Sequence, residues 1–151
     1  EDWRNDAYIA DIVSGEVTRL ELGPGLVYRQ ALSDLYALYF TLHPDGDNAV
    51  LLDTNPKSPT FHQIIARIPL DPLQNPPPRG GDPFAAESRR VSISPDGRWG
   101  FISHGGDGLI SIIDTQTQQV VNKLATPTPL TAGGYLIAVQ SDMELGDTIG
   151  R

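Results

Sequence analysis

The stretch Val91–Val121, which reads VSISPDGRWGFISHGGDGLISIIDTQTQQVV, alternates short apolar runs with polar, glycine-rich turns. At its start, valine and isoleucine alternate with serine, which is the period-two pattern of a β-strand with one buried face. The segment Pro95–Arg98 then favours a tight turn, because proline presets φ, aspartate accepts hydrogen bonds from nearby amides and glycine tolerates positive φ. The stretch therefore opens with a strand and a turn.

Three more strands are predicted in the same stretch. Trp99–Ser103 is rich in residues that suit a pleated surface, and the glycine-rich turn Gly105–Gly108 follows it. Leu109–Asp114 is almost wholly apolar, which predicts a strand covered on both faces. After a polar turn, Val120–Leu124 is the fourth strand. Four antiparallel strands in succession are typical of one blade of a β-propeller.

Two of these motifs occur again elsewhere in the chain. Phe40–Gly46 aligns with Val91–Gly97, and the two segments lie 51 residues apart. Tyr8–Val17 aligns with Ser111–Val120 at a spacing of 103 residues, close to twice the first spacing. Propeller blades run about 40 to 50 residues, so both motifs indicate a propeller repeat that is slightly long.

The repeats predict an all-β chain of about three β-propeller blades. The predicted division is a half blade (residues 7–22), a blade (35–70), a Pro-rich loop (69–88), a second blade (90–124) and the start of another (134–140). A closed propeller needs about four or more blades, so the ring is incomplete within this sequence. Two explanations stay open: the sequence is part of a longer chain, or copies or another subunit complete the ring.

Ser94–Arg98, the aromatic strand after it, the Gly-Asp-Gly turn and Ile112–Thr115 together resemble the YVTN-type β-propeller repeat. That repeat occurs in bacterial and archaeal surface-layer proteins. Similar propellers form cofactor domains of nitrite and nitrous oxide reductases and the large subunit of methylamine dehydrogenases. They also occur in some lactonases. The resemblance covers roughly half of the chain and implies the fold more than a function, because one architecture hosts unrelated functions.

The sequence departs from the family pattern in two places. Gly100–His104, GFISH, replaces the Tyr-Val-Thr-Asn strand, and the middle repeat has no recognisable Asp-Thr turn after its third strand. The Gly-His and Trp-Asp signatures of intracellular WD40-like scaffolds are also absent, which disfavours that alternative. We expect an extracytoplasmic propeller, periplasmic or secreted.

Composition excludes several classes of site. The chain has no cysteine, which rules out disulfides, zinc–thiolate and iron–sulfur sites and haem attachment through cysteine. Its net charge of −8 argues against nucleic-acid binding, because phosphate groups attract a basic surface. No apolar run approaches the length of about 20 residues that a transmembrane helix needs.

Candidate site residues are few. His43, His62 and His104 form no close-spaced ligand pair, and the aspartates of the turns are expected to accept backbone hydrogen bonds, so no metal site and no catalytic set is predicted. His104 lies where a strand meets Gly105 and Gly106, whose backbone a ligand can approach closely. These three residues are the candidate cofactor-binding residues, although the sequence predicts no particular cofactor.

The Pro-rich loop is the second candidate. Its prolines forbid a central strand and favour an extended conformation. One interpretation is a surface connection between blades, and the other is a partner-docking arm built around Pro76, Pro77, Pro78 and Phe84.

Two functions follow from these observations. The first is a non-enzymatic binding or scaffolding propeller segment, or a subunit of a larger extracytoplasmic assembly, whose partners are other subunits or the rest of its own chain. The alternative is a fragment of a cofactor-dependent redox or lactonase-like propeller enzyme, with His104 lining its site. The absence of a catalytic set favours the first.

Overall fold

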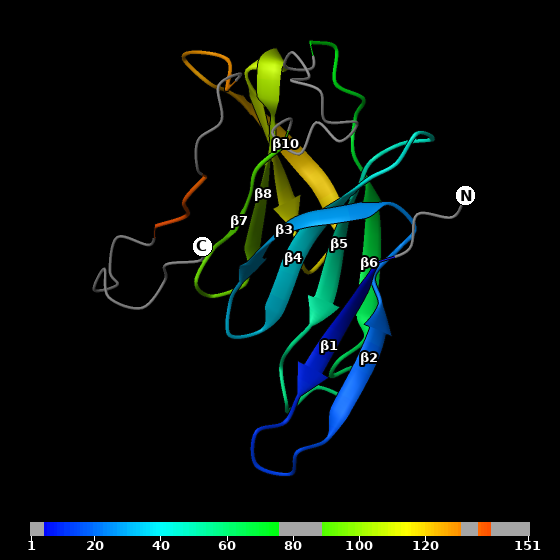
Figure 1. The fold of residues 1–151 in the computed structure, drawn as a ribbon. Helices are drawn as coiled ribbons and strands as arrows, with labels where there is room; N and C mark the ends of the chain where they lie inside the picture. Colours follow the sequence, from blue (N-terminus) through cyan, green and yellow to red (C-terminus); the bar gives the residue numbers. More distant parts are fainter. Residues whose placement is uncertain (1–4, 76–88, 131–135, 140–151) are drawn as a thin grey trace.

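The computed structural model describes residues 5–75, 89–130 and 136–139, which form ten β-strands and one short 3-10 helix (Figure 1). The first sheet pairs β1 (Asp6–Ala10) with β2 (Val17–Glu21). The second, the middle sheet, has the order β3 (Leu26–Leu32), β4 (Tyr36–Leu42), β5 (Asn48–Asp53), β6 (Ile64–Pro69). The third, the terminal sheet, consists of β7 (Val91–Ile93), β8 (Trp99–His104), β9 (Leu109–Asp114) and β10 (Gln119–Ala125), with helix η2 (Gly105–Asp107) between β8 and β9.

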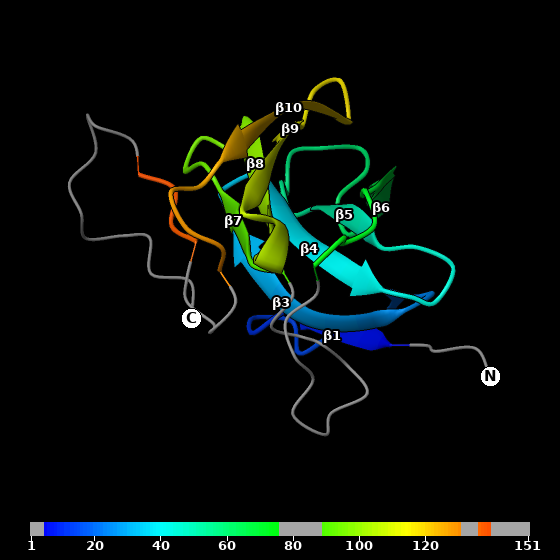
Figure 2. The ribbon, with the colours of Figure 1, turned by 90° about the horizontal axis from the view of Figure 1, so that it is seen from above.

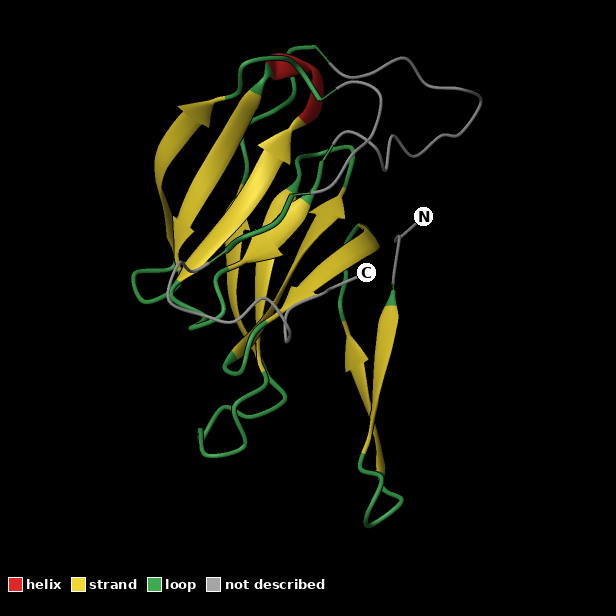
Figure 3. Ribbon diagram, turned by 90° about the vertical axis from the view of Figure 1, so that its left-hand side faces the viewer, coloured by secondary structure: helices red, strands yellow, loops and turns green. Residues whose placement is uncertain are grey.

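All strand pairs are antiparallel, and both four-stranded sheets are simple meanders, so the predicted all-β, blade-like architecture is confirmed. The sheets stack face to face, with the middle sheet between the β1–β2 hairpin and the terminal sheet (Figures 2 and 3). The turn of the hairpin reaches beyond the stacked sheets (Figure 1). In the part of the chain that the structure describes, no helix is long and apolar enough to span a membrane.

Two apolar clusters hold the stack together. Residues of the middle sheet such as Leu38 and Phe40 pack against Ile93, Ile102 and Ile113 of the terminal sheet. On the opposite face of the middle sheet, a second cluster joins Leu22, Ala37, Tyr39, Val50 and Leu52 to the hairpin. Successive side chains of a strand point to opposite faces, so β4 contributes alternately to the two clusters. The middle sheet is therefore covered on both faces.

The turn between the first and second strands is built in the same way in both four-stranded sheets. In the terminal sheet, the Ser94 amide donates to the Trp99 carbonyl and the Trp99 amide donates to Ser94 Oγ. In the middle sheet, Ser33 and Tyr36 exchange the same two kinds of hydrogen bond. Serine hydroxyls stabilise turns in this way because they substitute for a backbone acceptor.

This equivalence corrects the repeat alignment made from the sequence. The turn His43–Gly46 joins β4 to β5, the second and third strands, whereas Ser94–Gly97 joins the first and second strands of the terminal sheet. The spacing of 51 residues therefore aligns two turns that occupy different places in their sheets. It also explains why β3, the first strand of the middle sheet, lies outside the range 35–70 predicted for this blade.

An aspartate turn follows the third strand in both four-stranded sheets. Asp114 Oδ1 accepts the amides of Gln116 and Thr117, and Asp53 Oδ1 accepts the amide of Asn55. Tyr36 pairs with Asp53 as Trp99 pairs with Asp114, so the two aspartates are structural counterparts. The prediction that the middle repeat lacks an Asp-Thr turn was therefore wrong: Asp53-Thr54 is that turn, and a long loop follows it before β6.

The remaining segments of the predicted division lie partly outside the described residues. Residues 76–88 of the Pro-rich loop are among these, including Pro76, Pro77, Pro78 and Phe84. Of the segment 134–140, residues 136–139 are described and are not in a strand. The Ala138 amide donates to Ser92 Oγ at 2.9 Å, which brings this segment against β7.

Candidate functional site

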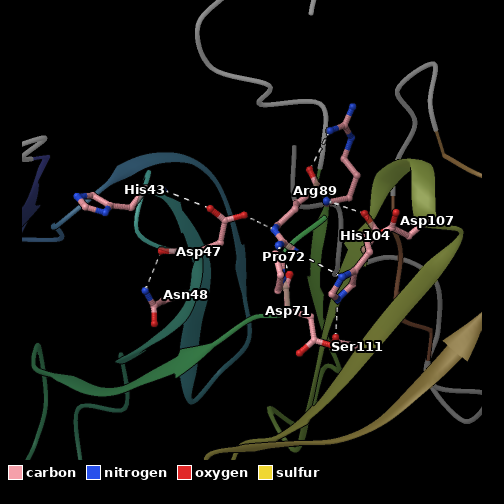
Figure 4. A network of polar contacts seen from close by, with 12 residues as sticks. His43, Asp47, Asn48, Asp71, Pro72, Arg89, His104, Asp107 and Ser111 are labelled. Atoms are coloured by element: carbon pink, nitrogen blue, oxygen red, sulfur yellow. Dashed lines mark hydrogen bonds and ion pairs between the residues drawn. The ribbon is translucent and has the colours of Figure 1, made fainter. Parts of the chain in front are cut away.

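A polar network joins the middle and terminal sheets at one rim (Figure 4). Its centre is Arg89, just before β7, whose side chain is fully buried. Arg89 Nε donates to Asp47 Oδ2 at 2.7 Å, and Nη2 donates to the Asp71 carbonyl oxygen at 2.7 Å. Asp47 also accepts the His43 amide at 3.2 Å. One guanidinium thus ties the β4–β5 turn to the segment that follows β6.

His104 extends this network into the terminal sheet. The residue is 2% exposed, with Nε2 2.7 Å from Ser111 Oγ and Nδ1 3.4 Å from Arg89 Nη1. A guanidinium can only donate, so Nδ1 is the acceptor, and Nε2 carries the proton that it donates to Ser111. Burial, and next the charge of Arg89, lower the pKa of His104 below its ordinary value. The imidazole is therefore held neutral.

The glycine turn after His104 is occupied by the protein's own backbone. A Cβ atom added at Gly106 would lie 1.8 Å from the carbonyl oxygen of Asn75, so only glycine permits this approach. The carbonyl oxygen of Gly105 accepts the Leu130 amide at 2.9 Å. The close backbone approach that the glycines were expected to offer a ligand is thus made by residues of this chain.

Asp107 holds the segment Gln74–Asn75 in place beside the glycine turn. Its carboxylate accepts the Gln74 amide at 3.0 Å, the Asn75 amide at 2.6 Å and Asn75 Nδ2 at 3.1 Å. Burial raises the pKa of this carboxyl, but the amide donors outweigh it and hold the pKa of Asp107 below its usual range. Nearby, the hydrogen bond from Lys123 lowers the pKa of Asp71.

The structure brings His104, Gly105 and Gly106 together and gives each a partner within the chain. His43 joins the same network through its backbone amide, whereas His62 lies in another loop and stacks on Phe61. Within residues 5–75, 89–130 and 136–139, no group of three or more His, Cys, Asp or Glu side chains could hold a metal ion.

Sequence reasoning missed the residues that organise this site, namely Arg89, Asp47 and Ser111. One signal was present: the pair Arg89-Arg90 directly precedes an apolar strand in an acidic chain. A basic residue at such a place is expected to be paired, because a buried charge needs a partner.

A second candidate is the outward face of the terminal sheet, the face turned away from the middle sheet. Alternation along the strands assigns five large apolar residues to it: Trp99, Phe101, Ile110, Ile112 and Leu124. Trp99 is 37% exposed and Leu124 is 47% exposed. The Arg98 guanidinium stacks on the Trp99 ring at 4.3 Å and pairs with Asp114 through both of its terminal nitrogens, which fixes the indole at the end of this face.

Strand register identifies the counterparts of these residues in the middle sheet. Leu38 pairs with Leu51 as Phe101 pairs with Ile112. Both leucines are fully buried against the terminal sheet, whereas their counterparts Phe101 and Ile112 are only half-buried. The outward face therefore repeats an apolar surface that is covered elsewhere in the molecule.

Comparison with solved structures supports the fold. The chain is similar to hydrazine synthase from Kuenenia stuttgartiensis, a protein that contains β-propeller domains, with a TM-score of 0.52 and 19% sequence identity. The match covers 82% of this chain and 30% of that chain, so the present chain spans about a third of its length. No protein family matches the sequence, and no curated protein matches it. At this identity the likeness concerns the fold alone, and the YVTN-type assignment stays a prediction.

Proposed function

We propose that the chain is a non-enzymatic β-propeller binding or scaffolding segment of a larger extracytoplasmic assembly. The observation that carries the proposal is the outward face of the terminal sheet. Its residues Phe101 and Ile112 occupy positions at which the middle sheet makes its main apolar contact. Contiguous apolar surface that stays exposed marks a site of protein–protein contact.

The sequence of β9 supports the same conclusion. Leu109–Asp114 has the nearly continuous apolar pattern of a strand with both faces covered. Within the described residues, Ile113 is buried against the middle sheet, but Ile110 and Ile112 on the other face are half-buried. A partner on the outward face would account for the pattern.

The geometry of the polar network favours a structural role for it. His104 uses both ring nitrogens for side chains of the chain itself, and Gly106 accommodates Asn75. A ligating histidine would instead need a ring nitrogen free to bind the metal or cofactor. The network serves to join two sheets, which is the requirement of a scaffold.

The test compares native and denatured mass of the protein purified from its natural source. We expect the wild-type chain to run in an assembly larger than itself, and Leu124→Glu on the outward face to release it. Ile12→Glu is the matched control, because Ile12 is 96% exposed at the tip of the β1–β2 turn, away from that face. An unchanged assembly in Leu124→Glu would contradict the proposal, as would stoichiometric metal or visible absorbance bands in the purified protein.

A further inference from the structure

We infer that the outward face of the terminal sheet receives the β1–β2 hairpin of a second copy of this chain. The inference rests on the proposed function and names the partner of the same surface. It follows from three observations: the hairpin has the features of a half blade, its own outer face is open, and the two faces correspond to surfaces already packed within the molecule.

The hairpin corresponds to the third and fourth strands of a blade. Asp11 Oδ1 accepts the amides of Val13 at 2.8 Å and Ser14 at 2.9 Å, as Asp114 Oδ1 accepts two amides after β9. Ala10 pairs with Val17 across the turn, as Ile113 pairs with Val120. The strands β1 and β2 are therefore the counterparts of β9 and β10.

The two faces of the hairpin differ in how they are used. Ala7 and Leu20 pack against the middle sheet. On the opposite face, Tyr8 is 66% exposed and Val17 is 60% exposed. Their counterparts in the terminal sheet are Ser111, which is buried, and Val120, which packs in the cluster between the two four-stranded sheets. Tyr8 and Val17 thus occupy positions that contact a preceding sheet when one is present.

The two open faces are complementary parts of the same kind of interface. Within one chain, β9 and β10 of the terminal sheet pack on one face of the middle sheet. The outward face of the terminal sheet is the counterpart of that face of the middle sheet. The open face of the hairpin is the counterpart of the face through which β9 and β10 make the contact. A second copy can therefore place its hairpin on the terminal sheet with the packing already seen between the two four-stranded sheets.

The segment Leu136–Val139 lies at the inner edge of the proposed interface. Ala138 bonds to Ser92 on the outward side of β7, and Ile137 and Val139 are 71% and 63% exposed. β7 contacts β3, the first strand of the middle sheet. The segment contacts β7 in turn, so β3, β7 and the segment follow one another along the stack of sheets. In the described residues, β1 pairs with β2 alone, which leaves one edge of β1 open toward further strands.

This arrangement is head-to-tail, and such contacts close into a ring when the rotation between copies permits it. The described residues of one chain supply three sheets to the stack. Two copies would supply about six positions, which is within the range of about four to eight blades in closed propellers. We therefore expect a dimer with twice the mass of one chain.

Sedimentation of the complete purified chain over a wide concentration range tests the inference. Wild type is expected to form the dimer. Leu124→Glu on one face and Val17→Glu on the other should each weaken association about 100-fold, because each buries a carboxylate in an apolar contact. Ile12→Glu, which adds the same charge at the exposed hairpin tip, should associate as wild type does. Circular dichroism would verify that all variants keep their β-structure.

Mixing the two defective variants separates head-to-tail contact from other arrangements. Leu124→Glu retains an intact hairpin and Val17→Glu retains an intact outward face, so the mixture should recover dimers through one contact. Val17→Glu that associates like wild type would overturn the hairpin inference while leaving the outward face as a contact surface. A wild-type chain that stays monomeric would also overturn it. The proposed function would fail separately, if Leu124→Glu left the native assembly from the natural source unchanged.

Discussion

The middle and terminal sheets have the same strand order and the same turn chemistry, yet they are buried differently. In the middle sheet, residues 37–41 of β4 and 49–53 of β5 are all buried. In the terminal sheet, the counterpart strands β8 and β9 are buried mainly on the side of the middle sheet, whereas Phe101, Ile110 and Ile112 on the other side are only half-buried. The comparison shows that position in the stack, more than apolar content, determines how much of a blade is covered.

The largest effect is expected for a matched pair of truncations, one in each sheet, that compares how much stability the two faces contribute. Leu51 is fully buried, and its counterpart Ile112 is half-buried on the outward face. Leu51→Ala should lower the free energy of unfolding by about 3 kcal/mol, because the substitution leaves a cavity between packed sheets. Ile112→Ala should cost only about 1 kcal/mol in the monomer, because its side chain is already partly hydrated. Urea unfolding at a protein concentration low enough to keep the chain monomeric measures both values.

Equal losses for the two variants would contradict the comparison, since they would mean that the outward face is covered as fully as the inner one. The pair is also informative when the chain associates. Ile112→Ala should then cost more at high protein concentration than at low concentration, whereas the cost of Leu51→Ala should change little.

The second prediction concerns the contact that joins the two sheets. Arg89→Met removes the donors for Asp47 and for the Asp71 carbonyl oxygen but keeps much of the apolar stem. We expect a loss of about 2 kcal/mol in the free energy of unfolding, because polar partners are left without a hydrogen bond between the sheets. Arg89→Lys should recover only part of it, because an ammonium group cannot span both acceptors in the fork geometry of a guanidinium.

Hydrogen exchange would localise the effect of Arg89→Met. Protection should fall first in β7 and in the segment that follows β6, which the guanidinium holds together. Loss of protection spread evenly over the hairpin and both sheets would contradict a local joining role for Arg89.

Sequence patterns predicted the strand-rich fold well, because the turns between its strands are specified by residues that are close together in the sequence. Pro95-Asp96-Gly97 and the aspartate before Thr115 each specify a turn from within a few residues. The alignment of Phe40–Gly46 with Val91–Gly97 failed for the opposite reason. Pro44-Asp45-Gly46 repeats the letters of Pro95-Asp96-Gly97 but lies between the second and third strands of its sheet, and strand order depends on pairing between distant residues.

The candidate site could be predicted only in part for the same physical reason. His104 was identified by its place at a strand end, but its partners Arg89 and Ser111 come from the segment before β7 and from β9. Their side chains meet only after the sheet forms. The backbone of Asn75 against Gly106 joins residues 31 positions apart, and no local pattern announces such a contact.

The smallest expected effect is a pH dependence that originates at His104. The groups around the ring are Arg89, Asp71, Lys123 and Asp107, and burial is the main cause of its lowered pKa. The unfolded chain therefore binds a proton at this residue near pH 6.5, whereas the folded chain does so only at lower pH. Stability should be unaffected by this residue well above pH 6.5 and should fall as the pH decreases from about 6.5 toward 5.

His104→Gln keeps a donor for Ser111 but has no group that titrates in this range. The urea midpoint of the variant should therefore change less between pH 7 and pH 5 than that of the wild type, even if the variant is less stable at every pH. The window avoids Asp71 and Asp107, whose pKa values are held below the ordinary carboxyl value. If the urea midpoint of His104→Gln changed with pH as much as that of the wild type, the pH dependence would originate at another group. The neutral, hydrogen-bonded histidine would then no longer explain how the rim between the two sheets responds to acid.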